Sequence, residues 1–118
     1  MRTKILGMVR GMNVDSTLDP VLRGFREALA ELYGPVLDRV VLFGSRARGD
    51  AHAESDYDVA VFLREMPDRR AEWDRLAHLR LRLLDAGGPF FEIIPFRASD
   101  YEARTPLMHE IRRDGVEL

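Results

Sequence analysis

Two acidic residues stand two positions apart at the start of an apolar run. Asp56 and Asp58 open the run that ends at Leu63. In a β-strand, alternate side chains share a face, so these two carboxylates would lie roughly 6.5 Å apart at Cα and point the same way. Carboxylates placed in this way can converge on one divalent cation. The pattern predicts a metal site, although an Asp-x-Asp pair is also found in solvated strand starts and helix caps.

A glycine-rich turn precedes this pair in the sequence. Gly44 and Ser45 follow the apolar run 39–43, and Arg46, Ala47, Arg48 and Gly49 continue the turn. Backbone N–H groups, the Ser45 hydroxyl and the positive end of a short helix could hold phosphate oxygens there, with help from Arg46 and Arg48. The Gly-Lys-Ser/Thr ending of a P-loop is missing. Taken alone, Gly-Ser after a strand is also a common turn, and the two arginines could equally be solvated.

A third acid interrupts another apolar run. Glu92 lies inside the run 90–96, where alternation places it on one face with Ile94 and Phe96. A buried glutamate is costly unless it is paired or binds a metal, which connects Glu92 with Asp56 and Asp58. The alternative is an ion pair with one of the many arginines.

Three carboxylates favour a hard cation such as Mg²⁺ or Mn²⁺. Zinc is disfavoured because the chain has no cysteine and only three separate histidines, His52, His78 and His109. His52 lies near the predicted site, but a lone loop histidine is usually just exposed. We assign no chemistry to the other two.

The elements that would position these residues can be read from the periodicity. Asp19-Pro20 is typical of a helix start, and the helical spacing continues until Gly34-Pro35. Runs 39–43, 57–63 and 90–96 read as strands. Helices are expected from Pro67-Asp68 to about 85 and from Thr105-Pro106 to Gly115. This order predicts an α+β fold, close to a two-layer α/β arrangement, with a small mixed sheet flanked by helices.

The long arginine-rich helix has two apolar edges. One edge carries Leu76, Leu79 and Leu83. We expect the other to be core as well, although it could instead meet a partner or a second copy of the chain. This second edge is Trp73, Ala77, Leu81 and Leu84. The arginines from Arg64 to Arg82 are most simply a solvated face.

Composition limits the possible partners and architecture. A chain of 118 residues with 46% hydrophobic content fits one domain, which we place at 17–118 after an N-terminal arm, 1–16, of open structure. A net charge of −2 argues against stable binding of duplex nucleic acid. No run approaches membrane-spanning length, and cysteine is absent, so we expect a soluble, cytoplasmic protein.

The paired motifs resemble the nucleotidyltransferase superfamily of DNA polymerase beta type. In the sequence from Gly44 to Gly49 and in its compact length, the chain is most similar to the minimal nucleotidyltransferase (MNT) proteins, the antitoxin partners of HEPN toxins. The resemblance implies that Gly44 and Ser45 bind the triphosphate of ATP. It also implies that Asp56 and Asp58 ligate Mg²⁺, with Glu92 as the third acid, although many members have aspartate at that place.

The resemblance further implies a reaction and a partner. AMP would pass from ATP to a tyrosine hydroxyl of a HEPN toxin, and whether the chain forms a homo- or hetero-oligomer is left open. Two alternatives are left open. One is transfer to a small molecule, for which the chain is short, and the other is a binding module that neutralises its partner by occlusion.

Overall fold

The secondary structure follows the predicted order of elements. A computed structural model describes residues 19–49 and 56–118. The N-terminal arm, 1–16, therefore lies outside the described residues, as does His52. In chain order the elements are α2 (Pro20–Tyr33), the 3₁₀ helix η1 (Gly34–Val36), β1 (Leu37–Phe43), α3 (Ser45–Arg48), β2 (Tyr57–Leu63), α4 (Arg69–Asp85), β3 (Phe91–Arg97), the 3₁₀ helix η2 (Ala98–Glu102), α5 (Pro106–Asp114) and β4 (Val116–Glu117).

Side-chain caps fix the starts of the three longer helices. The Asp19 carboxylate accepts a hydrogen bond from the Val21 N–H at 2.8 Å, Asp68 accepts one from Ala71 at 3.3 Å, and the Thr105 hydroxyl accepts one from Met108 at 3.2 Å. Each bond satisfies a backbone donor that the first helical turn leaves open. The helix starts predicted from Asp19-Pro20 and Thr105-Pro106 are confirmed.

The four strands form one mixed sheet in the order β3-β2-β1-β4. β1 runs antiparallel to β2 and to β4, whereas β2 and β3 are parallel. Two register pairs matter for the site: Phe43 opposes Asp58, and Asp58 lies beside Glu92. The predicted mixed sheet is confirmed.

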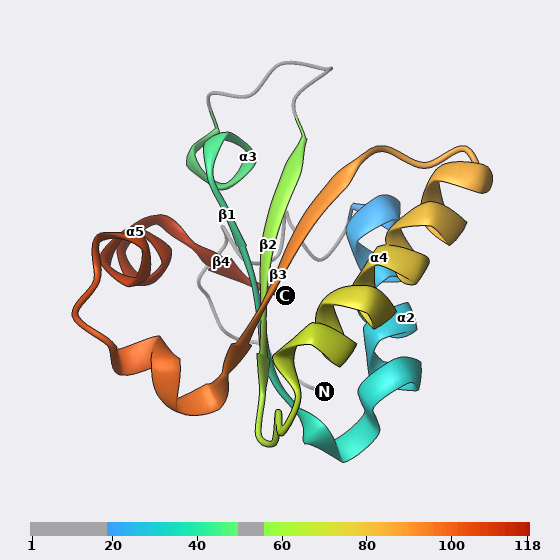
Figure 1. Ribbon diagram of the computed structural model, residues 1–118. Helices are drawn as coiled ribbons and strands as arrows, with labels where there is room; N and C mark the ends of the chain where they lie inside the picture. The colour runs from blue at the N-terminus through green and yellow to red at the C-terminus, as the bar shows by residue number, and fades with distance from the viewer. Residues whose placement is uncertain (1–18, 50–55) are drawn as a thin grey trace, which may run out of the picture.

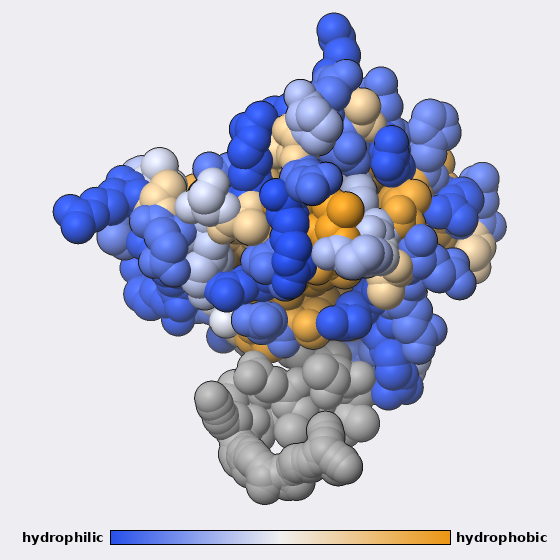
Figure 2. Space-filling model, turned by 90° about the horizontal axis from the view of Figure 1, so that it is seen from below, coloured by the Kyte–Doolittle hydropathy of each residue, from blue (hydrophilic) through white to orange (hydrophobic). Residues whose placement is uncertain are grey.

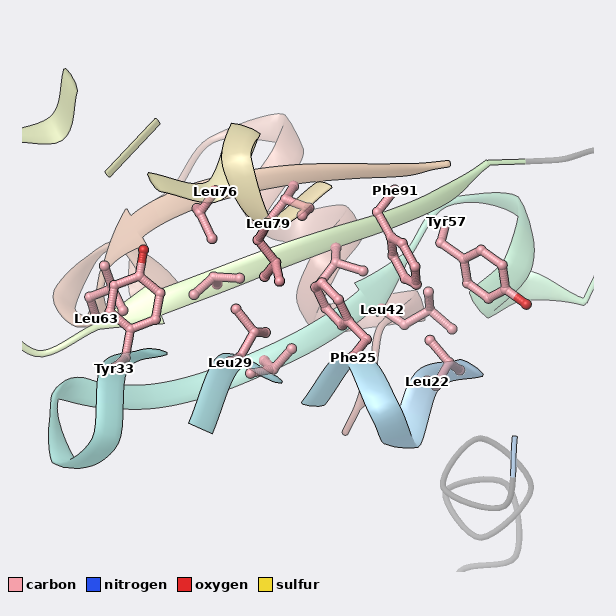
Figure 3. Packing of buried hydrophobic residues seen from close by; sticks show 14 of the residues in the cluster. Leu22, Phe25, Leu29, Tyr33, Leu42, Tyr57, Leu63, Leu76, Leu79 and Phe91 are labelled. Atoms are coloured by element: carbon pink, nitrogen blue, oxygen red, sulfur yellow. The ribbon is translucent and has the colours of Figure 1, made fainter. Parts of the chain in front are cut away.

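Helices cover both faces of this sheet (Figure 1). α2 and α4 lie on one face, where they bury a large apolar cluster that includes Phe25, Leu29, Leu76 and Phe91. Figure 3 shows these side chains meeting between the helices and the strands. On the opposite face, α5 packs Met108 and Ile111 against Val41, Phe43, Ala60 and Phe62.

One expectation about α4 is wrong. Its first apolar edge is buried at Leu76 and Leu79, each 1% exposed. The second edge is not core, since Trp73 is 39% exposed, Leu81 57% and Leu84 36%. The reason is geometric: α4 meets the sheet and α2 along a single side, so a second stripe of apolar residues has nothing to pack against within the described residues.

The end of the sheet opposite α3 carries a buried polar pair. The Tyr33 hydroxyl donates to the Glu72 carboxylate at 2.9 Å, and Arg75 lies 3.8 Å from the same carboxylate oxygen. Burial raises the pKa of Tyr33, and the neighbouring Glu72 carboxylate adds to that rise. Figure 2 views this end from below and shows an apolar area set among hydrophilic residues. Because the Tyr33 hydroxyl and the Glu72 carboxylate are bonded to each other, we assign this pair a structural role in packing α2 against α4.

No helix in the described part of the chain combines the length and the apolar content needed to cross a membrane.

Candidate functional site

The predicted site residues gather at one edge of the sheet. β1 ends there at Phe43, while β2 and β3 begin there, at Tyr57 and Phe91. The edge is the upper one in Figure 1, where α3 stands directly above β1. Registry brings the start of β2 beside both of its neighbours, since Asp58 is paired with Phe43 on one side and Glu92 on the other.

Gly44 makes the turn from β1 into α3. Its backbone has φ 76° and ψ −157°, a conformation that is essentially restricted to glycine. The Gly44 carbonyl accepts hydrogen bonds from the N–H groups of Ala47 and Arg48, both at 3.1 Å. A helix does not bond the N–H groups of its own first residues, which include Ser45 here. The turn therefore starts a short helix directly at the end of β1.

A second constraint on Gly44 comes from Asp58. A Cβ built on Gly44 would collide with a carboxylate oxygen of Asp58 and lie 3.2 Å from its carboxyl carbon. The glycine therefore lets the carboxylate pack against the backbone of the turn. Thus the Gly44 turn and Asp58 form a single structural unit.

The three predicted acids lie on or beside the face of the sheet that α5 covers. Asp58 and Glu92 are half-buried, and they share this face with Ala60 and Ile94, respectively. Neighbouring strands are about 4.8 Å apart, so their side chains are adjacent. Asp56 precedes β2 and is exposed. The placement of Glu92 on one face with Ile94 and Phe96 agrees with the predicted alternation.

The electrostatics of Asp58 report this crowding of acids. Burial raises the pKa of Asp58, and the negative charges of Asp56, Glu92 and Glu110 raise it further, while Arg48 acts in the opposite direction. The ionised form of the Asp58 carboxylate is therefore destabilised in the folded protein. A positive charge placed among these groups would relieve it.

The two arginines of the turn have contacts of different kinds. The Arg46 guanidinium lies over the Tyr57 ring, 4.1 Å from its centroid. Arg48 lies 3.6 Å from the carboxylate of Glu110 on α5. Both residues thus extend away from α3 to neighbouring elements.

Sequence reasoning missed Glu110 and the Arg46–Tyr57 contact. Glu110 sits in a short helix that reads as amphipathic, and its relation to Asp58 arises only when α5 folds back onto the sheet. The sequence pattern predicts for Tyr57 only a place in a buried strand. No local signal in the sequence marks either contact.

The two histidines to which we assign no chemistry, His78 and His109, lie on helices. The His78 ring Nδ1 donates to the Asp74 carbonyl oxygen at 2.9 Å within α4, and His109 Nδ1 lies 3.3 Å from Arg112 within α5. Both histidines are exposed. These local contacts account for both rings.

The donor set suits a hard divalent cation. Asp56, Asp58 and Glu92 supply carboxylate oxygens, and the crowding at Asp58 favours added positive charge. Within residues 19–49 and 56–118, however, no three acidic or histidine side chains converge closely enough to hold a metal by themselves. Mg²⁺ usually binds through one or two carboxylates together with substrate phosphates, so an incomplete protein cage fits a magnesium–nucleotide site.

Known proteins show similarity over the same region. Residues 22–106 match the family profile described as a nucleotidyltransferase domain. Over 47 residues, the chain is 45% identical to a protein of Methanocaldococcus jannaschii assigned by inference as a protein adenylyltransferase. This match spans 40% of the chain and 48% of that protein, so the chain covers about half of its relative.

Solved structures agree with the fold. A toxin–antitoxin crystal structure with AMP-PNP matches 80% of this chain and 69% of its own, at a TM-score of 0.57 and 26% identity. The MNT antitoxin complex with a tri-AMPylated Shewanella oneidensis HEPN toxin matches at 0.51 and 22% identity, over 80% and 66% of the two chains, and shows the shared fold alone. The matched span exceeds half of the chain and includes Gly44, Asp58 and Glu92, so the protein belongs to the nucleotidyltransferase domain family.

Proposed function

We propose that this protein is a Mg²⁺-dependent nucleotidyltransferase that moves AMP from ATP to a hydroxyl group of a partner protein. The observation that carries the proposal is the packing of the Asp58 carboxylate against the Gly44 turn, with Glu92 on the adjoining strand. Family membership supplies the reaction class. The two together favour a nucleotide held by the turn and a cation held by the acids.

Each residue has a distinct part in this proposal. The backbone at Gly44 and Ser45 would bind the triphosphate, with Arg46 and Arg48 beside it. Asp56, Asp58 and Glu92 would hold Mg²⁺. When bound, the ion would neutralise phosphate charge and polarise the reacting groups. Asp58 then keeps its ionised form despite the neighbouring acids.

The proposed transfer needs no reactant other than ATP and the acceptor hydroxyl. The acceptor oxygen forms a bond to the α-phosphorus, and the bond from that phosphorus to the oxygen bridging the β-phosphorus breaks. Pyrophosphate leaves with the bonding electron pair. We propose that a carboxylate of the site, that of Glu92, accepts the proton of the hydroxyl.

We further propose that the acceptor is a tyrosine of a HEPN-type toxin and that the modification makes this protein an antitoxin. The support is by similarity, since the matched structures are toxin–antitoxin complexes, one containing AMP-PNP and one a tri-AMPylated HEPN toxin. We place its action in the cytoplasm, where ATP is available, and the absence of cysteine agrees with that setting.

The test is AMP transfer to a candidate HEPN-type partner protein. The purified proteins are incubated with MgCl₂ and ATP, and the partner is weighed by intact-protein mass spectrometry. We expect a mass gain of one or more AMP groups with the wild type and none with Asp58→Asn. Asp85→Asn, the same chemical change at an exposed position of α4, is the control and should transfer normally.

Two other outcomes identify the alternatives. A partner that is neutralised but never modified, and that Asp58→Asn neutralises equally well, would establish occlusion. Transfer of AMP only to a small hydroxyl compound would identify a small-molecule nucleotidyltransferase. Either outcome would overturn the proposal of protein AMP transfer.

A further inference from the structure

Tyr57 lies between the two aspartates in the sequence but points to the opposite face of the sheet. It is 6% exposed and belongs to the apolar cluster under α2 and α4, whereas Asp58 faces α5. Its ring is the outer member of an aromatic row. Phe25 stacks on Phe91 with centroids 4.4 Å apart, and Tyr57 follows Phe91 at 5.0 Å. Figure 3 shows Tyr57 at the end of this row.

The exposed side of the row meets the turn. The Arg46 guanidinium lies 4.1 Å from the centroid of the Tyr57 ring, a distance suited to a cation–π contact. Arg46 directly follows Ser45, so this contact joins the start of α3 to the start of β2. The Tyr57 hydroxyl lies 3.4 Å from Asp19, at the far limit of a hydrogen bond, whereas the ring packs closely on both sides.

α3 depends on such contacts because it is short. A helix of four residues has too few internal hydrogen bonds to be stable by itself. Its described side-chain contacts go to separate elements: Arg46 to β2, Ala47 to the main apolar cluster and Arg48 to α5. Of these, the Arg46 contact is the nearest along the chain to Gly44 and Ser45.

We propose that Tyr57 is a positioning residue for nucleotide binding. Its ring, supported by Phe91, fixes Arg46 and thereby the backbone of the Gly44–Ser45 turn. The inference rests on the proposed function, because it assumes that this turn binds the nucleotide. It assigns the effect to the aromatic ring and gives the hydroxyl no part.

We expect four variants to differ in their affinity for ATP. Tyr57→Phe keeps the ring and should bind ATP as the wild type does. Tyr57→Leu and Arg46→Gln each remove the cation–π contact, and we expect about tenfold weaker ATP binding from either. Because both remove the same contact, the double variant should be no weaker than the worse single variant by more than about twofold.

A matched control exists on the other face of the sheet. The Arg39 guanidinium lies over the Tyr101 ring at 3.7 Å from the centroid, and this ring also packs against Phe62. Tyr101→Leu therefore removes the same kind of contact at a distance from the turn. It should lower stability while leaving ATP affinity unchanged.

The experiment is calorimetric titration of a nonhydrolysable ATP analogue, with MgCl₂, into the full chain and each variant. Thermal unfolding is measured in parallel, and KM and kcat are compared where transfer is observed. We expect Tyr57→Leu to raise KM with little change in kcat, because it weakens ground-state binding. If Tyr57→Leu does not fold, Tyr57→Met, which also removes the ring, supplies the answer, because Arg46→Gln would in addition remove the phosphate contact proposed for Arg46.

The outcomes are distinct. Folded Tyr57→Leu or Arg46→Gln protein with wild-type affinity would overturn the inference, as would an equal loss of affinity in Tyr101→Leu. A loss in Tyr57→Phe as large as that in Tyr57→Leu would also overturn it, by pointing to the hydroxyl. A wild type that binds no nucleotide would instead refute the proposed function itself.

Discussion

The carboxylate of Asp58 packs against the Cα of Gly44, where any other residue would place a side chain. This relationship links two motifs that are well separated in the sequence. It follows from the antiparallel register of β1 and β2, which sets Asp58 opposite Phe43, the last residue before the turn. The most specific prediction concerns this glycine.

Gly44→Ala should destabilise the protein and abolish nucleotide binding. The backbone at Gly44 has φ 76°, and a Cβ there would also displace Asp58, so we expect a loss of about 1–3 kcal/mol in the free energy of unfolding. Gly24→Ala is the control. Its Cβ would meet nothing within 4 Å, and in the interior of α2 alanine should stabilise by about 0.5–1 kcal/mol. Urea unfolding measures both, and a neutral Gly44→Ala would contradict the packing.

Asp58→Asn should abolish transfer but stabilise the metal-free protein at neutral pH. The pKa of Asp58 is raised in the folded state, so the folded protein holds its proton more tightly than the unfolded chain. Stability is therefore lost as pH rises from the ordinary pKa of 3.8 through the higher folded value. Asp58→Asn has no ionisable group at this position, so the variant does not lose stability in this way as pH rises.

The check is urea unfolding with EDTA at several pH values. The stability difference between Asp58→Asn and the wild type should be smallest at acidic pH and grow in favour of the variant as pH rises to neutral. Asp85→Asn should show no such trend. A difference that is constant across the range would mean that Asp58 does not titrate in this way.

The stability gained from a bound cation should depend on the acids of the site and not on acids elsewhere in the chain. With a nonhydrolysable ATP analogue, Mg²⁺ at one hundred times its dissociation constant should add about 2.7 kcal/mol of stability, all of it lost in EDTA. We expect Glu92→Gln to lose much of this gain. Glu31→Gln, an exposed site on α2, should keep it. Thermal shift assays measure both, and equal gains in the two variants would exclude Glu92 as a ligand.

Alanine substitutions on the two apolar edges of α4 should have very different effects on the free energy of unfolding. Leu76→Ala removes a side chain that is 1% exposed and should cost about 2–5 kcal/mol. Leu81→Ala changes one that is 57% exposed and should stay within about 0.5 kcal/mol. Chemical denaturation of the isolated chain compares them. A large loss in Leu81→Ala would indicate that this edge is covered.

Local signals explain what could be predicted from the sequence. Asp19 and Thr105 were recognised as helix starts because capping depends on residues within the same turn. The strand β2 and the face of Glu92 followed from alternation. The Asp-x-Asp pair and the Gly-Ser turn were identified by spacing and by resemblance to a family.

The remainder depends on tertiary packing. Trp73 and Leu81 were expected in the core because a helical pattern shows which residues share an edge but not whether that edge meets another element. The strand β4 has only two residues, too few for a periodic signal, and forms by pairing with Leu42 and Val41. The influence of Glu110 on Asp58 likewise depends on the packing of α5.

The central claim is that the acids on β2 and β3 and the Gly44–Ser45 turn hold one metal–nucleotide complex. A crystal structure with Mn²⁺ and a nonhydrolysable ATP analogue tests it most directly, because anomalous scattering locates the ion. We expect an ion bound by Asp56 and Asp58, with Glu92 beside it and the triphosphate on the backbone of the turn. An ordered nucleotide bound elsewhere, or one on the turn without an ion at Asp58, would contradict it.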